Sequence, residues 1–172
     1  MKILIMGSWR ISEAEKYKNY CDAVGKEIAI RGHEIISGGG EGISEFVINS
    51  YRKYGGKKYT AIIPSREAID SVGEKLGPEP DELIQLDLDY PERNIKMIKR
   101  CDLLIALPGS LGTLDEIILS INDYDKKVFV VDVGTTAELM KFVSEKIPKL
   151  NHLLHFGTDI TEGIDWLIEE KT

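Results

Sequence analysis

The sequence predicts an α/β protein in which a mostly parallel central sheet is covered by helices on both faces, as a three-layer sandwich. Apolar runs bounded by glycine alternate with amphipathic segments along the whole chain, which is the pattern of successive β-α-β units. The 172 residues suit one compact core, and 42% hydrophobic with 30% charged residues is typical of a globular protein. We therefore expect a single domain over residues 1–172.

Each element in the first half is justified by its apolar spacing and its glycine boundary. The predicted strands are short apolar runs, and the predicted helices have apolar residues at helical spacing with glycine at the end, such as Gly32 and Gly55. In chain order the segments are strand 3–6, helix 13–31, strand 33–36, a helix that begins at Ile43 and strand 59–63.

The second half begins with the least patterned stretch of the chain. Residues 64–80 contain several glycines and prolines, which predicts a mobile surface loop with one helical turn. Weak alternation over 83–88 indicates a short strand, and Pro91 suits the first turn of a helix. The remaining segments are a helix from Pro91, strand 102–107, helix 111–121, strand 128–131, helix 137–147 and helix 160–168.

Charge and cysteine content exclude several classes of protein. Twenty-two Lys and Arg against twenty-nine Asp and Glu give a net charge of −7, so we expect no binding to a nucleic-acid polymer. The apolar run Ile3–Met6 is far shorter than the ~20 residues of a spanning helix, so we expect no membrane association. Cys21 and Cys101 lie in amphipathic patterns typical of buried free thiols, which favours the cytoplasm.

Glycine-rich turns follow three of the predicted strands. In an open parallel sheet such turns lie at the carboxyl ends of the strands, where backbone N–H groups and helix N-termini bind anions. For any single turn, a tight connection without a ligand is an equal alternative. Together they predict that a Rossmann-like domain holds a small phosphorylated ligand in one crevice. The predicted contacts are Gly7, Ser8, Gly38, Gly39, Gly40, Gly42, Pro108, Gly109, Ser110, Gly112 and Thr113.

The turns do not match the common nucleotide-binding fingerprints. In the stretch from Gly40, the third glycine of a dinucleotide-binding motif is replaced by Glu45, and no Gly-Lys-Ser/Thr follows any turn. A dinucleotide-binding protein of the NAD type and a P-loop NTPase are therefore both disfavoured. We expect no cofactor. We expect no metal site either, because His152 and His155 lack a third ligand.

Glu116 is the most informative carboxylate. On a helix that begins at Leu111, it shares a face with Gly112 and Thr113 beside the expected anion site. A carboxylate there suits a cation, a sugar hydroxyl or the positive charge that develops when an N-glycosidic bond is cleaved. The alternative is that Asp115 and Glu116 only favour the positive end of the helix dipole, which is worth about 0.3–1 kcal/mol.

The order and spacing of these motifs over most of residues 3–135 resemble the lonely-guy family of cytokinin riboside 5′-monophosphate phosphoribohydrolases, once described as lysine decarboxylases. The motifs are Gly7-Ser8, Ser37-Gly38-Gly39-Gly40-Glu41-Gly42, Pro64, Arg93 ahead of Met97 and Asp102, and Pro108-Gly109-Ser110-Leu111-Gly112-Thr113-Leu114-Asp115-Glu116. The resemblance implies that Arg93 and Glu116 are catalytic and that the glycine turns hold the nucleotide phosphate. It also implies a homodimer, which we expect to form through the helices carrying Arg93 and Ile117.

Two residues depart from the family pattern. Ser110 replaces a motif glycine, and Asn94 follows Arg93 where the family has lysine. The Arg-Asn pair resembles the DprA-related branch that includes molybdenum cofactor carriers, which bind without hydrolysing. Two functions are thus expected from the resemblance. The first is hydrolysis of a nucleoside 5′-monophosphate-like ligand to free base and ribose 5-phosphate, and the alternative is a non-catalytic carrier or sensor of a phosphorylated heterocycle such as the molybdenum cofactor.

Overall fold

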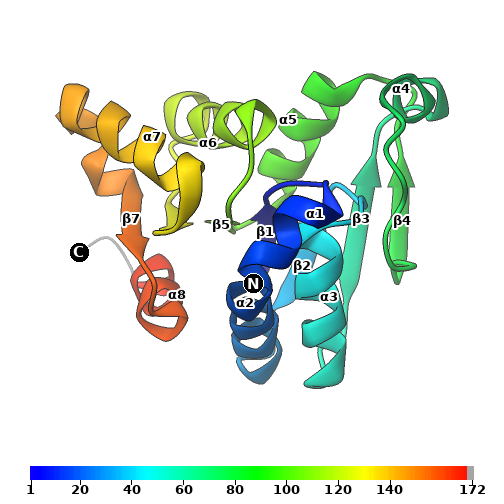
Figure 1. Cartoon of the computed structure of the whole chain (residues 1–172), viewed down its shortest axis with the longest axis horizontal. Coiled ribbons are helices and arrows are strands. Elements are labelled where there is room, and N and C mark those ends of the chain that lie inside the picture. The colour runs from blue at the N-terminus through cyan, green and yellow to red at the C-terminus, as the bar shows by residue number, and fades with distance from the viewer. Residues whose placement is uncertain (170–172) are drawn as a thin grey trace.

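Seven parallel strands form one sheet in the computed structural model, which describes residues 1–169 (Figure 1). Their order across the sheet is β4-β3-β2-β1-β5-β6-β7, and every neighbouring pair is parallel. The predicted α/β class and the Rossmann-like sheet are confirmed. The strands are β1 (Lys2–Met6), β2 (Glu34–Ser37), β3 (Tyr59–Ile63), β4 (Glu82–Gln85), β5 (Leu103–Ala106), β6 (Val128–Val131) and β7 (Leu154–Gly157).

Helices cover both faces of the sheet, with α5, α6 and α7 above it and α2, α3 and α8 below it in Figure 1. Successive side chains of a strand point to opposite faces, so Ile3 and Ile5 enter the lower core while Leu4 and Met6 enter the upper one. The three-layer prediction is therefore confirmed. The helices are α1 (Ile11–Ala14), α2 (Lys18–Ile30), α3 (Ile43–Lys53), α4 (Arg66–Val72), α5 (Tyr90–Arg100), α6 (Leu111–Asp123), α7 (Gly134–Lys146) and α8 (Ile160–Ile168), with 3₁₀ turns η1 (Glu15–Tyr17) and η2 (Pro148–Leu153).

The point where strand order reverses fixes the position of the site. From β1 the chain adds β2, β3 and β4 on one side, and then returns to add β5, β6 and β7 on the other. In the register of the central pair, Met6 of β1 lies opposite Ala106 of β5, so the loops after these two strands leave the sheet at the same level. A crevice opens where neighbouring loops leave toward opposite faces, which is where ligands of such sheets bind.

Residues 64–80 are more ordered than the predicted mobile loop with one helical turn. Helix α4 has seven residues, and the Ser65 hydroxyl caps it by accepting from the Ala68 N–H at 3.2 Å. The chain after α4 is tied to the turn after β2, since the Gly77 N–H donates to the Gly39 carbonyl at 2.8 Å. This pairing joins positions distant in sequence, so local pattern does not reveal it.

One predicted helix and one strand also differ from the sequence-based expectation. The predicted helix 13–31 is divided into α1, η1 and α2, and it ends before Gly32, whose φ is 71°. Strand β7 was not predicted, because only Leu154 of its four residues is buried and none is β-branched. It pairs with β6 at the edge of the sheet, where a strand needs only one buried face.

The two cysteines are free and buried, as expected. Burial raises the pKa of both the Cys21 and the Cys101 thiols to about 12, so neither is a reactive thiolate at neutral pH. Within residues 1–169, no helix combines the length and the apolar character needed to cross a bilayer.

Candidate functional site

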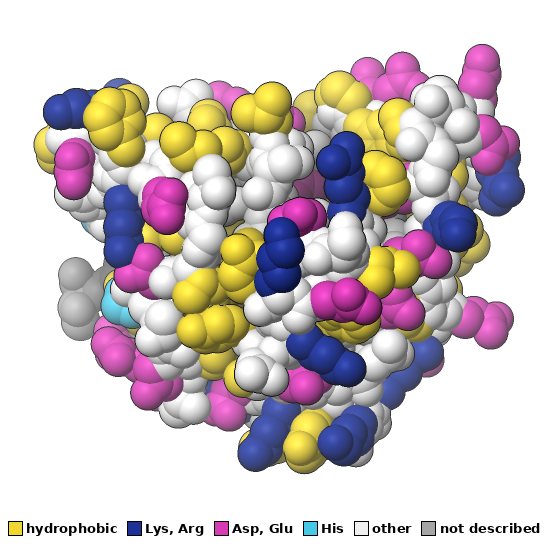
Figure 2. Space-filling view, viewed as in Figure 1, with side chains coloured by type: hydrophobic (Ala, Val, Ile, Leu, Met, Phe, Trp, Pro, Cys, Tyr) yellow, Lys and Arg dark blue, Asp and Glu magenta, His cyan; other side chains and the backbone are white. Residues whose placement is uncertain are grey.

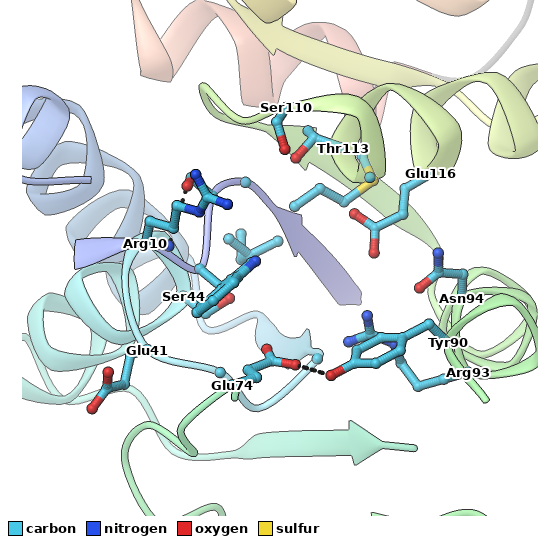
Figure 3. A pocket seen from close by; sticks show the side chains of 18 of the residues that line it. Arg10, Glu41, Ser44, Glu74, Tyr90, Arg93, Asn94, Ser110, Thr113 and Glu116 are labelled. Carbon is cyan, nitrogen blue, oxygen red and sulfur yellow. Dashed lines mark hydrogen bonds between the residues drawn. The ribbon is translucent and has the colours of Figure 1, made fainter. Parts of the chain in front are cut away.

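A cavity of about 480 Å³ lies at the carboxyl ends of β1, β2 and β5 (Figure 3). Parts of all three glycine-rich turns line it, so the structure brings the three turns to one crevice as the sequence predicted. The helices α5 and α6 complete one wall. The predicted site residues that line the cavity are Gly7, Ser8, Gly38, Gly40, Arg93, Ser110, Gly112, Thr113 and Glu116, and Asn94 lines it as well.

Backbone hydrogen bonds of Ser8 join the turn after β1 to two others. The Ser8 N–H donates to the Pro108 carbonyl at 3.0 Å, and the Ser8 carbonyl accepts from the Ile43 N–H at 2.9 Å. The loop after β5 is fixed further by Thr136, whose hydroxyl accepts from the Gly109 N–H at 2.9 Å and lies 3.1 Å from the Gly109 carbonyl. These contacts set the position of the N-terminus of α6.

The N-terminus of α6 lines the cavity through Ser110, Gly112 and Thr113. Ser110 is the N-cap residue but gives no side-chain cap, and the Leu114 N–H is the first to bond back, to the Ser110 carbonyl at 3.1 Å. The N–H groups before Leu114 therefore lack an intrahelical acceptor, and the helix dipole adds partial positive charge there. This end of the cavity suits a phosphate.

The turn after β2 offers fewer free donors than its glycines suggest. The Gly39 N–H donates to the Ser37 hydroxyl at 3.1 Å, and the Glu41 N–H donates to the Lys75 carbonyl at 3.2 Å. Both donors are used within the protein. We infer that this turn shapes the cavity, with α6 as the stronger anion site.

Four predicted contacts lie outside the lining of this cavity. Gly39 and Gly42 adopt φ values of 79° and 75° and pack against β3 and against the loop after Ser8, respectively. Pro108 and Gly109 line a second hollow of about 350 Å³, which shares Ser8, Trp9 and Arg10 with the first. Positive φ and close packing thus account for two of the glycines in the motif.

Arg93 is nine-tenths buried and incompletely paired. Its side chain is 9% exposed, and its Nε has no hydrogen-bond partner among the described residues. The guanidinium lies directly against Gly38, where any Cβ would overlap its Nη1 atom, and 5.1 Å from the ring centroid of Tyr90. The neighbouring Asn94 is 7% exposed, and its buried Oδ1 also lacks a partner. Unsatisfied buried donors and acceptors of this kind favour a polar ligand.

Glu116 faces the centre of the cavity from α6, across from Arg10 in Figure 3. It is 9% exposed, and burial is the main reason that its pKa rises from 4.5 to about 7. The positive charge of Arg93 lowers this pKa, while Asp115 and Glu74 raise it. A carboxyl group that titrates near neutral pH is suited to proton transfer and to stabilising positive charge.

Sequence reasoning missed several residues that line the cavity. Tyr90 precedes Arg93 and Asn94 by three and four positions, so helical spacing places the three on one face. Glu74, in contrast, lies in the unpatterned stretch after α4, and no local signal marks it. Its carboxylate accepts a hydrogen bond from the Tyr90 hydroxyl at 2.5 Å (Figure 3).

Stability should depend on pH through Glu116. The folded state binds this proton more tightly than the unfolded state, so the free energy of unfolding falls as the pH rises from 4.5 to about 7. Glu116→Gln removes the titration. Relative to wild type, we expect the variant to gain up to about 3 kcal/mol between roughly pH 4 and pH 8, at about 1.4 kcal/mol per pH unit. Urea unfolding at several pH values measures the difference.

The exposed Glu138 on α7 provides a matched control. Glu138→Gln makes the same chemical change on the exposed surface, so it reports the effect of a Glu→Gln substitution outside the cavity. A pH-independent difference for Glu116→Gln would contradict the raised pKa.

The chain is similar in sequence to a known family and to curated proteins. The model of the SLOG cluster4 family matches residues 1–157. A cytokinin riboside 5′-monophosphate phosphoribohydrolase of Mycobacterium tuberculosis is 30% identical over 149 residues, which cover 76% of this chain and 74% of that protein. A probable enzyme of the same name from Oryza sativa subsp. japonica is 27% identical over 83% of this chain, and the chain spans only 62% of its length.

Solved structures show the same fold at lower identity. The molybdenum cofactor carrier protein of Chlamydomonas reinhardtii superimposes with a TM-score of 0.75 and 22% identity, covering 95% of this chain and 93% of the other. The molybdenum cofactor binding protein of Rippkaea orientalis gives a TM-score of 0.72 and 20% identity, covering 97% and 93%. The chain belongs to the SLOG cluster4 family, within the lonely-guy superfamily.

Proposed function

We propose that the protein binds a nucleoside 5′-monophosphate in the cavity and hydrolyses its N-glycosidic bond. The observation that carries the proposal is the placement of Glu116, a buried carboxyl with a pKa of about 7, beside the uncapped N-terminus of α6. A phosphate at α6 would hold the ribose within reach of this carboxyl. The names of the relatives in rice and Mycobacterium tuberculosis support the same reaction class.

The reaction separates the base from the sugar. The bond between C1′ and the base nitrogen breaks, the base leaves with the electron pair and takes a proton, and the oxygen of a water molecule bonds to C1′. Ribose 5-phosphate and free base result. Ionised Glu116 would stabilise the positive charge on the ribosyl group or orient the water, and Arg93 would bind the substrate and favour the ionised form of Glu116.

A carrier role is the second candidate, and a specific observation favours it. Asn94 lies beside Arg93 with a buried, unpartnered Oδ1, which suits binding of a polar heterocycle without requiring chemistry. The solved structures with this fold include proteins named for carrying or binding the molybdenum cofactor. In this case a phosphorylated pterin would occupy the same cavity.

We also propose that the protein is a homodimer that uses the α6 and α7 face. Figure 2 shows hydrophobic side chains gathered over these helices along the upper edge of the molecule. Leu111, Ile118, Leu139 and Phe142 are 80%, 46%, 43% and 58% exposed, whereas Ile117 lies in the core. No large apolar side chain of α5 is comparably exposed, so α7 replaces α5 in the expected interface.

Replacing Ile118 and Phe142 with polar residues should halve the mass of the particle. Light scattering at micromolar concentration would compare the variant with wild type. A wild-type particle of about 19 kDa, the mass of one chain, would contradict the dimer.

The phosphate position is tested by charge at the cap of α6. Ser110→Asp should cap the helix well and yet repel a phosphate, so the protein stays folded while affinity for a nucleoside monophosphate falls by on the order of tenfold or more. Ser110→Asn offers the same cap without the charge, so it should weaken binding less than Ser110→Asp does. Calorimetric titration with a nucleoside monophosphate measures both, and equal binding by the two variants would place the phosphate elsewhere.

The reaction is tested with a panel of nucleoside 5′-monophosphates, with release of base followed by chromatography. Glu116→Gln should lower turnover by on the order of 10²-fold and leave binding nearly intact, whereas Arg93→Ala should weaken both. The control Glu138→Gln should match wild type. If no monophosphate is cleaved while a phosphorylated pterin raises the melting temperature, the carrier role is correct.

A further inference from the structure

Arg93 is fixed by surfaces on two sides. Gly38 lies against the guanidinium, and the ring of Tyr90 lies 5.1 Å from the guanidinium carbon. Its Nε, shielded from solvent, has no hydrogen-bond partner in the described part of the chain. A long arginine side chain has many rotamers, so a defined position here depends strongly on these two contacts.

Tyr90 is itself anchored from another segment. Its hydroxyl donates to Oε2 of Glu74 at 2.5 Å, the length of a charge-assisted hydrogen bond. Burial and the nearby Glu74 carboxylate raise the pKa of Tyr90 far above its usual range, so the hydroxyl remains a donor at neutral pH. The Tyr90 side chain is therefore held at both ends, by its backbone in α5 and by the hydrogen bond of its hydroxyl to Glu74.

Glu74 is in turn held by the turn after β2. The backbone carbonyl of the next residue, Lys75, accepts a hydrogen bond from the Glu41 N–H at 3.2 Å. The Glu74 Oε1 atom lies directly against Gly40. The same glycine turn thus supports Arg93 through Gly38 and Glu74 through Gly40. This arrangement gives the glycine-rich turn a role that does not require it to bind phosphate.

We propose that Tyr90 and Glu74 are positioning residues: the hydrogen bond between them holds the Tyr90 ring so that Arg93 is clamped against Gly38 and directed at the ligand. The proposal rests on the proposed function for its catalytic consequence, but the position of Arg93 can be measured without any ligand. Loss of the ring should free the guanidinium. Loss of the hydroxyl or of the carboxylate should loosen it to a smaller extent.

The first test observes the Arg93 Nε–H directly by NMR of ¹⁵N-labelled protein, with Arg93→Lys identifying the signal. Tyr90→Leu should accelerate its exchange with water by on the order of tenfold, and Tyr90→Phe and Glu74→Ala should have a smaller effect in the same direction. The matched control is Tyr54→Leu, which replaces an exposed tyrosine at the C-terminal end of α3. It should leave the exchange of the Arg93 Nε–H unchanged. Unchanged exchange in Tyr90→Leu, with the fold intact by melting temperature, would overturn the proposal.

The second test asks whether Tyr90 acts through Arg93. With a nucleoside monophosphate as substrate, Tyr90→Leu alone should lower kcat/KM by on the order of tenfold relative to wild type. Added to Arg93→Ala, the same substitution should lower kcat/KM by less than about twofold further. Independent, multiplicative losses would contradict the clamp and indicate a merely structural role. If wild type cleaves no monophosphate, the proposed function fails, and the NMR result still decides the positioning proposal.

Discussion

The site depends on one short length of backbone, the peptide groups on either side of Ser8. Its N–H bonds to the loop after β5 and its carbonyl bonds to the start of α3, so three strand ends are held at fixed separation. Without these hydrogen bonds, the N-terminus of α6 and the glycine turn after β2 would not be held in a defined position relative to each other. Parallel topology brings these loops together, and the hydrogen bonds of Ser8 set their spacing.

Within this arrangement, the buried side chains of Glu116 and Arg93 are only partly compensated by their surroundings. Glu116 is buried deeply enough that its pKa rises to about 7, and Arg93 lowers it only in part. Arg93 in turn has a buried nitrogen without a partner. Buried charges without full pairing cost the folded protein stability. This arrangement favours a ligand that supplies oxygen atoms to the guanidinium and a developing positive charge to the carboxyl.

Enzyme and carrier would use the same frame differently. Both would need a phosphate at the N-terminus of α6 and the polar side chains of α5, so phosphate binding would not distinguish them. The distinction lies in whether Glu116 faces a bond that breaks. A clamped Arg93 matters most to the enzyme, because small displacements of a charged group reduce stabilisation of a transition state more than they reduce binding.

The sequence by itself determined the alternation of strands and helices, the three turns and the face shared by Thr113 and Glu116, because these depend on local periodicity and on the geometry of parallel sheets. It did not reveal β7, whose edge position leaves little apolar pattern. Tertiary structure alone decided that the Gly109 N–H is not free, since it bonds to the Thr136 hydroxyl from a distant part of the chain. The contact between Glu74 and Tyr90 was likewise decided by tertiary structure, because it requires folding of the chain between them and leaves no periodic signal.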